Sequence, residues 1–202
     1  MISGPRAVSR ALAIAYRSAA VPAPSDLIGY ANVMKTLRLR WLRRLLLAMA
    51  VPLSIAAQAA AVGAPAPGFS LPDAGGKTTT LDALKGQVVY VDFWASWCGP
   101  CRRSFPWMNE MSQKYGDRGF KVVAINVDKK RADADRFLTQ VPANFTIVYD
   151  PVGAAPGAWD VKGMPSSFLV DARGNVVTAE TGFPDERKAE LEAKIRTLLQ
   201  IR

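Results

Sequence analysis

The chain contains no histidine and only two cysteines. The absence of histidine excludes Ser-His-Asp and Cys-His catalysis, metal sites built on imidazole, and histidine proton shuttles. No apolar run reaches the roughly 18 residues that a membrane span needs. With 202 residues, 50% of them apolar, the chain is too long for a disulfide-stapled miniprotein and too apolar for a disordered protein. We therefore expect one globular domain with an appendage.

The positive charge of the chain lies mostly near its N-terminus. The formal net charge is +9, to which residues 1–33 contribute +2, residues 34–59 contribute +5 and residues 60–202 contribute +2. A protein that binds nucleic acid through phosphate contacts carries its basic residues in the folded part. The distribution therefore argues against a nucleic-acid partner.

Residues 34–59 have the three parts of a secretory signal. Five basic residues follow Met34, a largely apolar stretch of 13 residues covers 45–57, and Ala57-Gln58-Ala59 is a small-x-small cleavage site. Cleavage after Ala59 would leave 143 residues in an exported, periplasmic location. The alternative is an uncleaved anchor in the inner membrane, for which the apolar stretch is short and interrupted by Pro52.

The segments on either side of this signal have simple interpretations. Because a signal peptide normally begins at the N-terminus, we expect translation to start at Met34 and residues 1–33 to be an extension from a misassigned start codon. A cytoplasmic tail is the alternative for residues 1–33. Residues 60–67, rich in alanine and proline, are predicted to be a flexible linker, and residues 68–202 to be the folded domain.

The folded part alternates strand and helix patterns, which predicts an α/β fold. Short runs rich in β-branched residues indicate buried strands, and Ala172-Arg173-Gly174 between two such runs indicates a hairpin. The C-terminal segment has Pro184 and two acidic residues in its first turn and one apolar stripe, which is typical of an amphipathic helix. The predicted strands are 88–93, 121–127, 145–149, 166–171 and 175–180. One predicted helix follows Cys101 and ends near residue 115, and two others cover 131–141 and 184–201.

The two cysteines, Cys98 and Cys101, are separated by two residues. Exported proteins use disulfides to join distant segments, but a bridge over so small a loop adds little stability through chain entropy. Structural zinc needs about four protein ligands, and the chain has no further cysteine and no histidine. The pair is therefore predicted to be a redox-active dithiol that works without a metal or another cofactor.

The position of the pair next to a predicted helix indicates how each thiol reacts. Cys98 precedes the helix, where unpaired N–H groups and the helix dipole favour a thiolate, the nucleophilic form. Cys101 lies one turn further on, close enough to attack a mixed disulfide formed at Cys98. Arg102 and Arg103 either add positive potential or form an ordinary solvated helix face.

Two separated motifs resemble the thioredoxin family. The sequence Asp-Phe-Trp-Ala-Ser-Trp-Cys-Gly-Pro-Cys, from Asp92 to Cys101, resembles the active-site strand and loop of thioredoxins. Pro106 resembles the proline that kinks the following helix in that family, and Gly163-Met164-Pro165-Ser166 is similar to its cis-proline loop. The motifs occur in the order that the family shows.

The resemblance extends over about residues 63–200. The segments 64–71 and 81–86 are similar to the exported TlpA-like and ResA-like branch of the family. The resemblance implies a thioredoxin-like fold, in which a central mixed β-sheet is flanked by helices, with an N-terminal extension. It also implies that the protein is a thiol-disulfide oxidoreductase.

The resemblance gives three residues a chemical role. Cys98 is implied to be the attacking thiolate and Cys101 the resolving thiol. Asp92 matches the buried acid of thioredoxins, and a carboxyl in an apolar strand has a pKa raised by desolvation, so it can exchange a proton with Cys101 near neutral pH. The alternative for Asp92 is a polar residue at a strand end that is bonded to backbone.

Five further residues are implied to bind the substrate or to shape the site. Pro165 is implied to follow a cis peptide bond, which is uncommon and in this family presents the backbone of Met164 to an extended substrate. Trp97 is implied to form a flat contact surface for the substrate, and Gly99 and Pro100 are implied to shape the loop.

The residues between and after the cysteines bear on the direction of electron flow. Gly-Pro is the dipeptide of reducing thioredoxins, which predicts a reductant of disulfides in client proteins, supplied with electrons by a membrane thiol donor. Many ResA-like members that act in cytochrome c maturation carry an acidic residue three positions after the second cysteine, where this chain has Ser104. The departure weakens the assignment to cytochrome c maturation but not the dithiol chemistry.

Three other functions remain open from the sequence. The first is a disulfide oxidase or isomerase of the same fold. The second is a module that binds Cu(I) through the two thiolates. The third is a relative of the peroxiredoxins, which is disfavoured because Val91 and Ala95 stand where those enzymes have proline and Thr or Ser before the reactive cysteine.

Overall fold

The computed structural model describes residues 60–201, so the predicted extension (1–33) and signal (34–59) lie outside the described residues. Five strands form one mixed sheet in the order β5-β4-β3-β6-β7. The parallel strands are β3 (Val88–Trp94), β4 (Phe120–Asn126) and β5 (Thr146–Tyr149). β6 (Ser166–Val170) pairs antiparallel with both β3 and β7 (Val176–Thr181).

The central strand β3 is buried along its whole length. Its side chains alternate between the two faces, so Tyr90, Asp92 and Trp94 lie on one face and Val89, Val91 and Phe93 on the other. Both faces are covered by other elements, which explains why the strand is a nearly continuous run of apolar residues.

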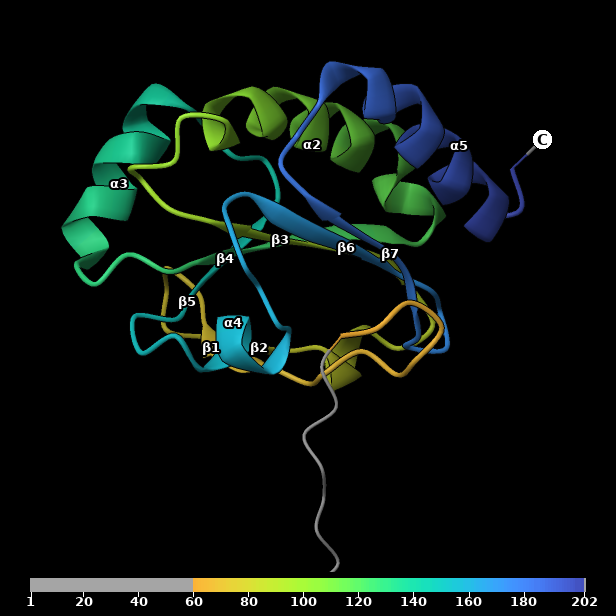
Figure 1. The fold of residues 1–202 in the computed structure, drawn as a ribbon, viewed down its shortest axis with the longest axis horizontal. Helices are drawn as coiled ribbons and strands as arrows, with labels where there is room; N and C mark the ends of the chain where they lie inside the picture. Colours follow the sequence, from red (N-terminus) through yellow and green to blue (C-terminus); the bar gives the residue numbers. More distant parts are fainter. Residues whose placement is uncertain (1–59, 202) are drawn as a thin grey trace, which may run out of the picture. The chain divides into compact units, whose positions relative to one another are not determined.

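Helices and short strands cover the two faces of the sheet (Figure 1). The helices α2 (Cys101–Tyr115), α3 (Arg131–Gln140) and α5 (Lys188–Leu198) lie on one side. On the other side lie the short hairpin of β1 (Ser70–Pro72) with β2 (Thr78–Thr80), and α4 (Ala154–Ala158). Each layer has its own apolar cluster, the first containing both cysteines and the second built around Phe93, Trp159 and Phe168.

The predicted strands and helices are confirmed, with differences at their ends. The C-terminal segment begins with a 3-10 turn, Asp185–Arg187, and Pro184 precedes this turn in an extended conformation instead of lying in the first turn of an α-helix. The apolar stripe of this segment packs on the core as predicted, with Leu191 and Ile195 fully buried. In the part of the chain from 60 to 201, no helix is long and apolar enough to cross a membrane.

The segment 60–67, predicted to be a flexible linker, is bound to the domain. The N–H of Gly63 donates to the carbonyl of Val176 at 2.8 Å, and the N–H of Ala66 donates to the carbonyl of Gly174 at 2.8 Å. Pro65 forms an isolated bridge with Asn175. The segment is held in place because backbone groups of the β6–β7 turn form hydrogen bonds with it. Its alanine- and proline-rich composition gives no sign of these partners.

Candidate active site

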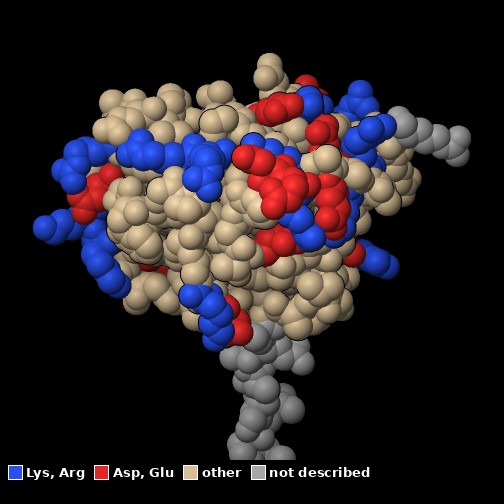
Figure 2. Space-filling view, turned by 45° about the horizontal axis from the view of Figure 1, so that its top comes forward, with Lys and Arg blue, Asp and Glu red and all other residues tan. Residues whose placement is uncertain are grey.

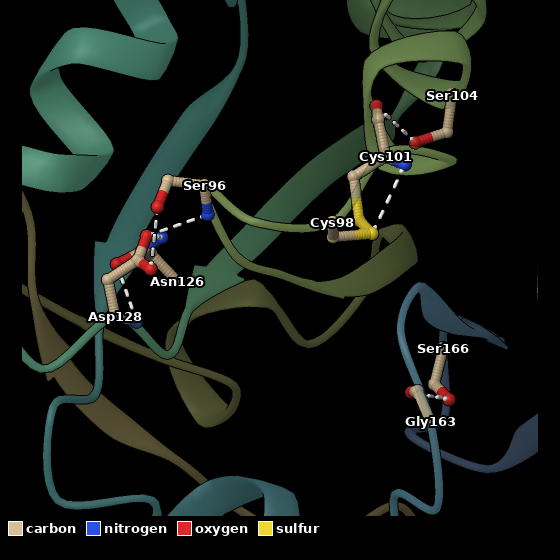
Figure 3. The surroundings of a disulfide bond; sticks show 8 residues. All are labelled: Ser96, Cys98, Cys101, Ser104, Asn126, Asp128, Gly163 and Ser166. Carbon is tan, nitrogen blue, oxygen red and sulfur yellow. Dashed lines mark hydrogen bonds between the residues drawn. A yellow bond between two sulfur atoms is a disulfide. The ribbon is translucent and has the colours of Figure 1, made fainter.

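The two cysteines lie at the carboxyl end of the parallel strands, in the connection from β3 to α2. They form a disulfide, with their Cα atoms 5.4 Å apart (Figure 3). Cys101, the first residue of α2, is completely buried, whereas Cys98 keeps 3% of its surface exposed. Because Cys98 is the less buried of the two, it is the cysteine that an incoming disulfide would meet first.

The sulfur of Cys98 takes the place of a helix cap. Pro100 occupies the N-cap position with φ −62° and provides no side-chain acceptor for the first N–H groups of α2. The N–H of Cys101 donates instead to the Sγ atom of Cys98 at 3.2 Å. This hydrogen bond and the positive end of the helix dipole both stabilise negative charge on that sulfur once the disulfide is reduced.

A buried carboxylate holds the loop that leads to Cys98. Asp128, just after β4, accepts hydrogen bonds from the N–H of Ser96 at 2.9 Å and from its hydroxyl at 2.9 Å. It also accepts one from the side-chain amide of Asn126 at 2.8 Å. Figure 3 shows these three side chains turned toward one another beside the disulfide. The connection is therefore fixed to the adjacent strand, 32 residues further along the chain.

Asp92, near the carboxyl end of β3, is buried without a hydrogen-bond partner. Its side chain is on the face of β3 that α2 covers, 1% of its surface is exposed, and neither of its carboxyl oxygens forms a hydrogen bond. Its register partners, Ala124 and Ser167, carry no charge. Burial raises the pKa of Asp92 well above its ordinary value. The alternative of a strand-end residue bonded to backbone is therefore wrong.

The second predicted motif reaches the same end of the sheet. Ser166 pairs with Phe93 near the end of β3, so the residues before Ser166 lie beside the connection that carries the cysteines. The peptide bond between Met164 and Pro165 is cis, as the resemblance implies. The hydroxyl of Ser166 donates to the carbonyl of Gly163 at 2.8 Å and closes this loop (Figure 3).

The residues on the solvent side of the disulfide form an exposed rim. Trp97 has 70% of its surface exposed, and Gly99, Arg102 and Arg103 are also exposed. Trp94, in contrast, is completely buried in the core. The structure thus brings all eight predicted site residues to one end of the sheet.

Three residues of the site, Ser96, Asn126 and Asp128, were not predicted from the sequence. The available signal was the pattern Asn-Val-Asp at the end of the second predicted strand, because polar residues at the carboxyl ends of parallel strands meet at one edge. Within residues 60–201, no group of three or more His, Cys, Asp or Glu side chains is arranged to hold a metal ion.

Comparison with known proteins gives a consistent assignment. The model of the Redoxin family matches residues 61–195. The thiol-disulfide oxidoreductase ResA of Bacillus subtilis (strain 168) is 36% identical over 124 residues, which are 61% of this chain and 69% of the relative.

Two solved structures share the fold. A Chlorobium tepidum protein described as thiol:disulfide interchange protein DsbE is 52% identical, with a TM-score of 0.67 over 69% of this chain and 98% of that one. A Bacteroides thetaiotaomicron protein described as a protein disulfide isomerase is 27% identical, with a TM-score of 0.65 over 69% of this chain and 91% of that one. With the disulfide at the start of α2, these likenesses show that the chain belongs to the Redoxin family and is a thioredoxin-like thiol-disulfide oxidoreductase.

Proposed function

We propose that this protein works as a reductant of disulfides in client proteins of an exported compartment, without a cofactor beyond its own dithiol. The observation that carries the proposal is the hydrogen bond from the N–H of Cys101 to the Sγ atom of Cys98. It provides a nucleophilic thiolate at the only cysteine with any exposed surface. A membrane thiol donor would return the disulfide to its reduced form.

In the first step, the thiolate of Cys98 attacks one sulfur of the client disulfide. A mixed disulfide forms between Cys98 and the client, and the second client sulfur leaves as a thiolate, which takes up a proton from solvent. The N–H of Cys101 favours the thiolate of Cys98 before the attack, which keeps this sulfur reactive at neutral pH.

In the second step, Cys101 resolves the mixed disulfide. The thiol of Cys101 gives its proton to the carboxylate of Asp92, and the resulting thiolate attacks the sulfur of Cys98. The first client sulfur leaves as a thiolate and the Cys98–Cys101 disulfide forms, so two electrons have passed to the client. Burial favours the protonated acid at Asp92, which makes this carboxylate a stronger base for the buried thiol.

The loop before β6 offers the client a backbone partner. Neither the N–H nor the C=O of Met164 is hydrogen-bonded within residues 60–201, whereas the carbonyl of Pro165 accepts from the N–H of Gly182 at 2.8 Å. We assign the free groups of Met164 to an extended client segment, with Trp97 as the apolar contact surface on the other side of the disulfide. We assign Gly99 and Pro100 to shaping the loop around Cys98.

The reduction potential tests the proposed direction. Potentials of proteins with this fold span about 150 mV, equivalent to roughly 7 kcal/mol for two electrons, so the potential decides between reductant and oxidant. We expect equilibration with glutathione or a reference thioredoxin to give a value near the reducing end, about −270 mV. A potential near about −120 mV, typical of strong periplasmic oxidants, would overturn the proposal.

Clients that take part in cytochrome c maturation are included in the proposal. The position where many ResA-like proteins carry an acidic residue is Ser104, which is buried and donates its hydroxyl to the carbonyl of Cys101 at 3.0 Å. Loss of c-type cytochromes in a deletion strain, restored by the intact gene but not by a variant with both cysteines changed to serine, would support this client. Normal cytochrome levels would exclude it.

A further inference from the structure

Positive charge without a counter-ion lies on the two segments that border the active-site connection. We call Arg102, Arg103, Lys129 and Lys130 the active-site cations. All four are exposed, and within residues 60–201 none has a carboxylate oxygen within 4.0 Å, whereas most other Lys and Arg side chains of the domain do.

Two of the active-site cations follow the disulfide directly. Arg102 and Arg103 are in the first turn of α2. The guanidinium of Arg102 donates to the side-chain carbonyl of Gln140 at 2.9 Å and lies 4.9 Å from the ring centre of Phe137. Both partners are uncharged, so they fix the position of the guanidinium without neutralising its charge.

The other two cations follow β4, the strand beside β3, and the residue before them is bonded to the connection that carries the cysteines. Lys129 and Lys130 follow Asp128, whose carboxylate is bonded to Ser96, two residues before Cys98. The ammonium of Lys129 donates to the carbonyl of Pro151, again an uncharged partner. Even with Asp128 counted, residues 96–103 and 128–130 together carry a formal charge of +3.

Acidic residues around the rim do not cancel this charge. Asp160, before the cis-proline loop, pairs with Lys162, and Asp185, before α5, pairs with Lys188. The hydrogen bond from Lys188 lowers the pKa of Asp185, and Arg103 also contributes to lowering it, but from beyond salt-bridge distance. On α3, Asp133 and Asp135 pair with arginines of the same helix. In Figure 2, a band of Lys and Arg runs from the left edge toward the centre, with one acidic patch at the far left, while Asp and Glu at the centre and right lie among further Lys and Arg.

We propose that the active-site cations form a docking surface for a client segment that carries acidic side chains next to its disulfide. The inference rests on the proposed function and names the class of client that it favours. Because Cys98 has only 3% of its surface exposed, a client must bring its chain close over the rim to reach the sulfur. Acidic flanks then approach unpaired cations, whereas basic flanks are repelled.

The test compares two synthetic peptides with the same internal disulfide, one flanked by aspartates and the other by lysines. The reduced protein is mixed with each peptide, and kcat/KM is measured between 10 mM and 500 mM salt. We expect the acidic peptide to react about tenfold faster at low salt, and the two rates to converge as salt screens the charges. Equal rates at low salt, or a faster basic peptide, would overturn the inference.

Charge-reversal variants show which residues cause the preference for the acidic peptide. Arg102→Glu with Arg103→Glu, and separately Lys129→Glu with Lys130→Glu, should each lower the ratio of the acidic to the basic rate. The ratio is the readout because a change in the reactivity of Cys98 alters both rates equally. The matched control is Arg118→Glu with Lys121→Glu, two cations near the opposite end of β4 that have no ion pair with another described residue, and it should leave the ratio unchanged.

A neutral disulfide separates this inference from the proposed function. If the reduced protein fails to reduce hydroxyethyl disulfide and both peptides, the function as a reductant is wrong and the inference falls with it. If all three are reduced and the ratio of the peptide rates is unaffected by either double reversal, only the docking surface is refuted.

Discussion

Replacing Asp92 with asparagine should make the protein more stable and less active. The pKa of Asp92 is raised by burial, so between pH 3.8 and the raised value the folded protein holds a proton that the unfolded chain has released. The free energy of unfolding of the wild type therefore falls as the pH rises through this window. Asp92→Asn removes that dependence because its side chain does not titrate.

The size of the effect follows from the environment of the carboxyl. A buried polar group without a partner costs about 1–3 kcal/mol when it is neutral and more when it is charged. The charged form of Asp92 has no hydrogen bond and no cation in its register positions, so above its pKa it carries an additional cost that the neutral asparagine avoids. At pH 8 we expect Asp92→Asn to be about 1–3 kcal/mol more stable than the wild type, equivalent to roughly 3–10 °C in Tm. At pH 4 the difference should nearly disappear.

Urea unfolding of the oxidised protein at both pH values measures the stability. The matched control is Asp150→Asn, because the buried carboxylate of Asp150 accepts hydrogen bonds from the N–H groups of Gly153 and Ala155. This control should lose stability at pH 8. An Asp92→Asn variant that is less stable than the wild type, or equally shifted at pH 4 and pH 8, would refute the reasoning.

The same variant should slow the second half of the reaction. Without the carboxylate, Cys101 loses the base that the proposed mechanism assigns to it, and general-base catalysis commonly contributes about 10²-fold or more. The decay of a mixed disulfide between Cys98 and a peptide, followed by acid quench and mass spectrometry, measures this step directly. An unchanged decay rate would remove Asp92 from the mechanism and leave its effect on stability intact.

Three further substitutions test other parts of the site. Cys101→Ser should leave clients attached to Cys98 as stable mixed disulfides on non-reducing gels, and recovery of none would contradict Cys98 as the entry thiol. Ser96→Ala should lower the free energy of unfolding by about 1.5 kcal/mol and Asp128→Ala by about 3 kcal/mol, because the second change leaves several donors unpaired. Equal losses of unfolding free energy in the two variants would show that the hydrogen bond of the Ser96 hydroxyl alone accounts for the stabilisation by Asp128. Trp97→Ala should raise KM for client peptides about fivefold and change stability by less than about 0.5 kcal/mol; an unchanged KM would place the indole outside the client interface.

The fold was predictable where the sequence pattern is long and local. The buried run of β3 and the amphipathic pattern of α5 are each set by residues close together in the chain, so their existence could be inferred. The strands β1 and β2 have three residues each, too few for a period of two to be recognised. The helix α4 has five residues, including a proline and a glycine, and its sequence indicates a loop.

The reactive residues of the site were predictable because each belongs to a short sequence motif. The hydrogen bonds that hold the active-site connection in place were not predictable. The cysteines, the cis-proline and Asp92 are recognisable from short stretches of sequence. The bond between Ser96 and Asp128 joins residues 32 positions apart and depends on the parallel pairing of β3 with β4. An aspartate after a strand otherwise indicates only a solvated loop, so its burial had to come from the structure.

The backbone bonds of Gly63 and Ala66 determine where the polypeptide enters the domain. They attach it to the β6–β7 turn, whereas β6 begins at the opposite end of the sheet, beside the cysteines. The first described residues therefore lie at the end of the sheet remote from the reactive sulfur, and they leave the rim around Cys98 uncovered.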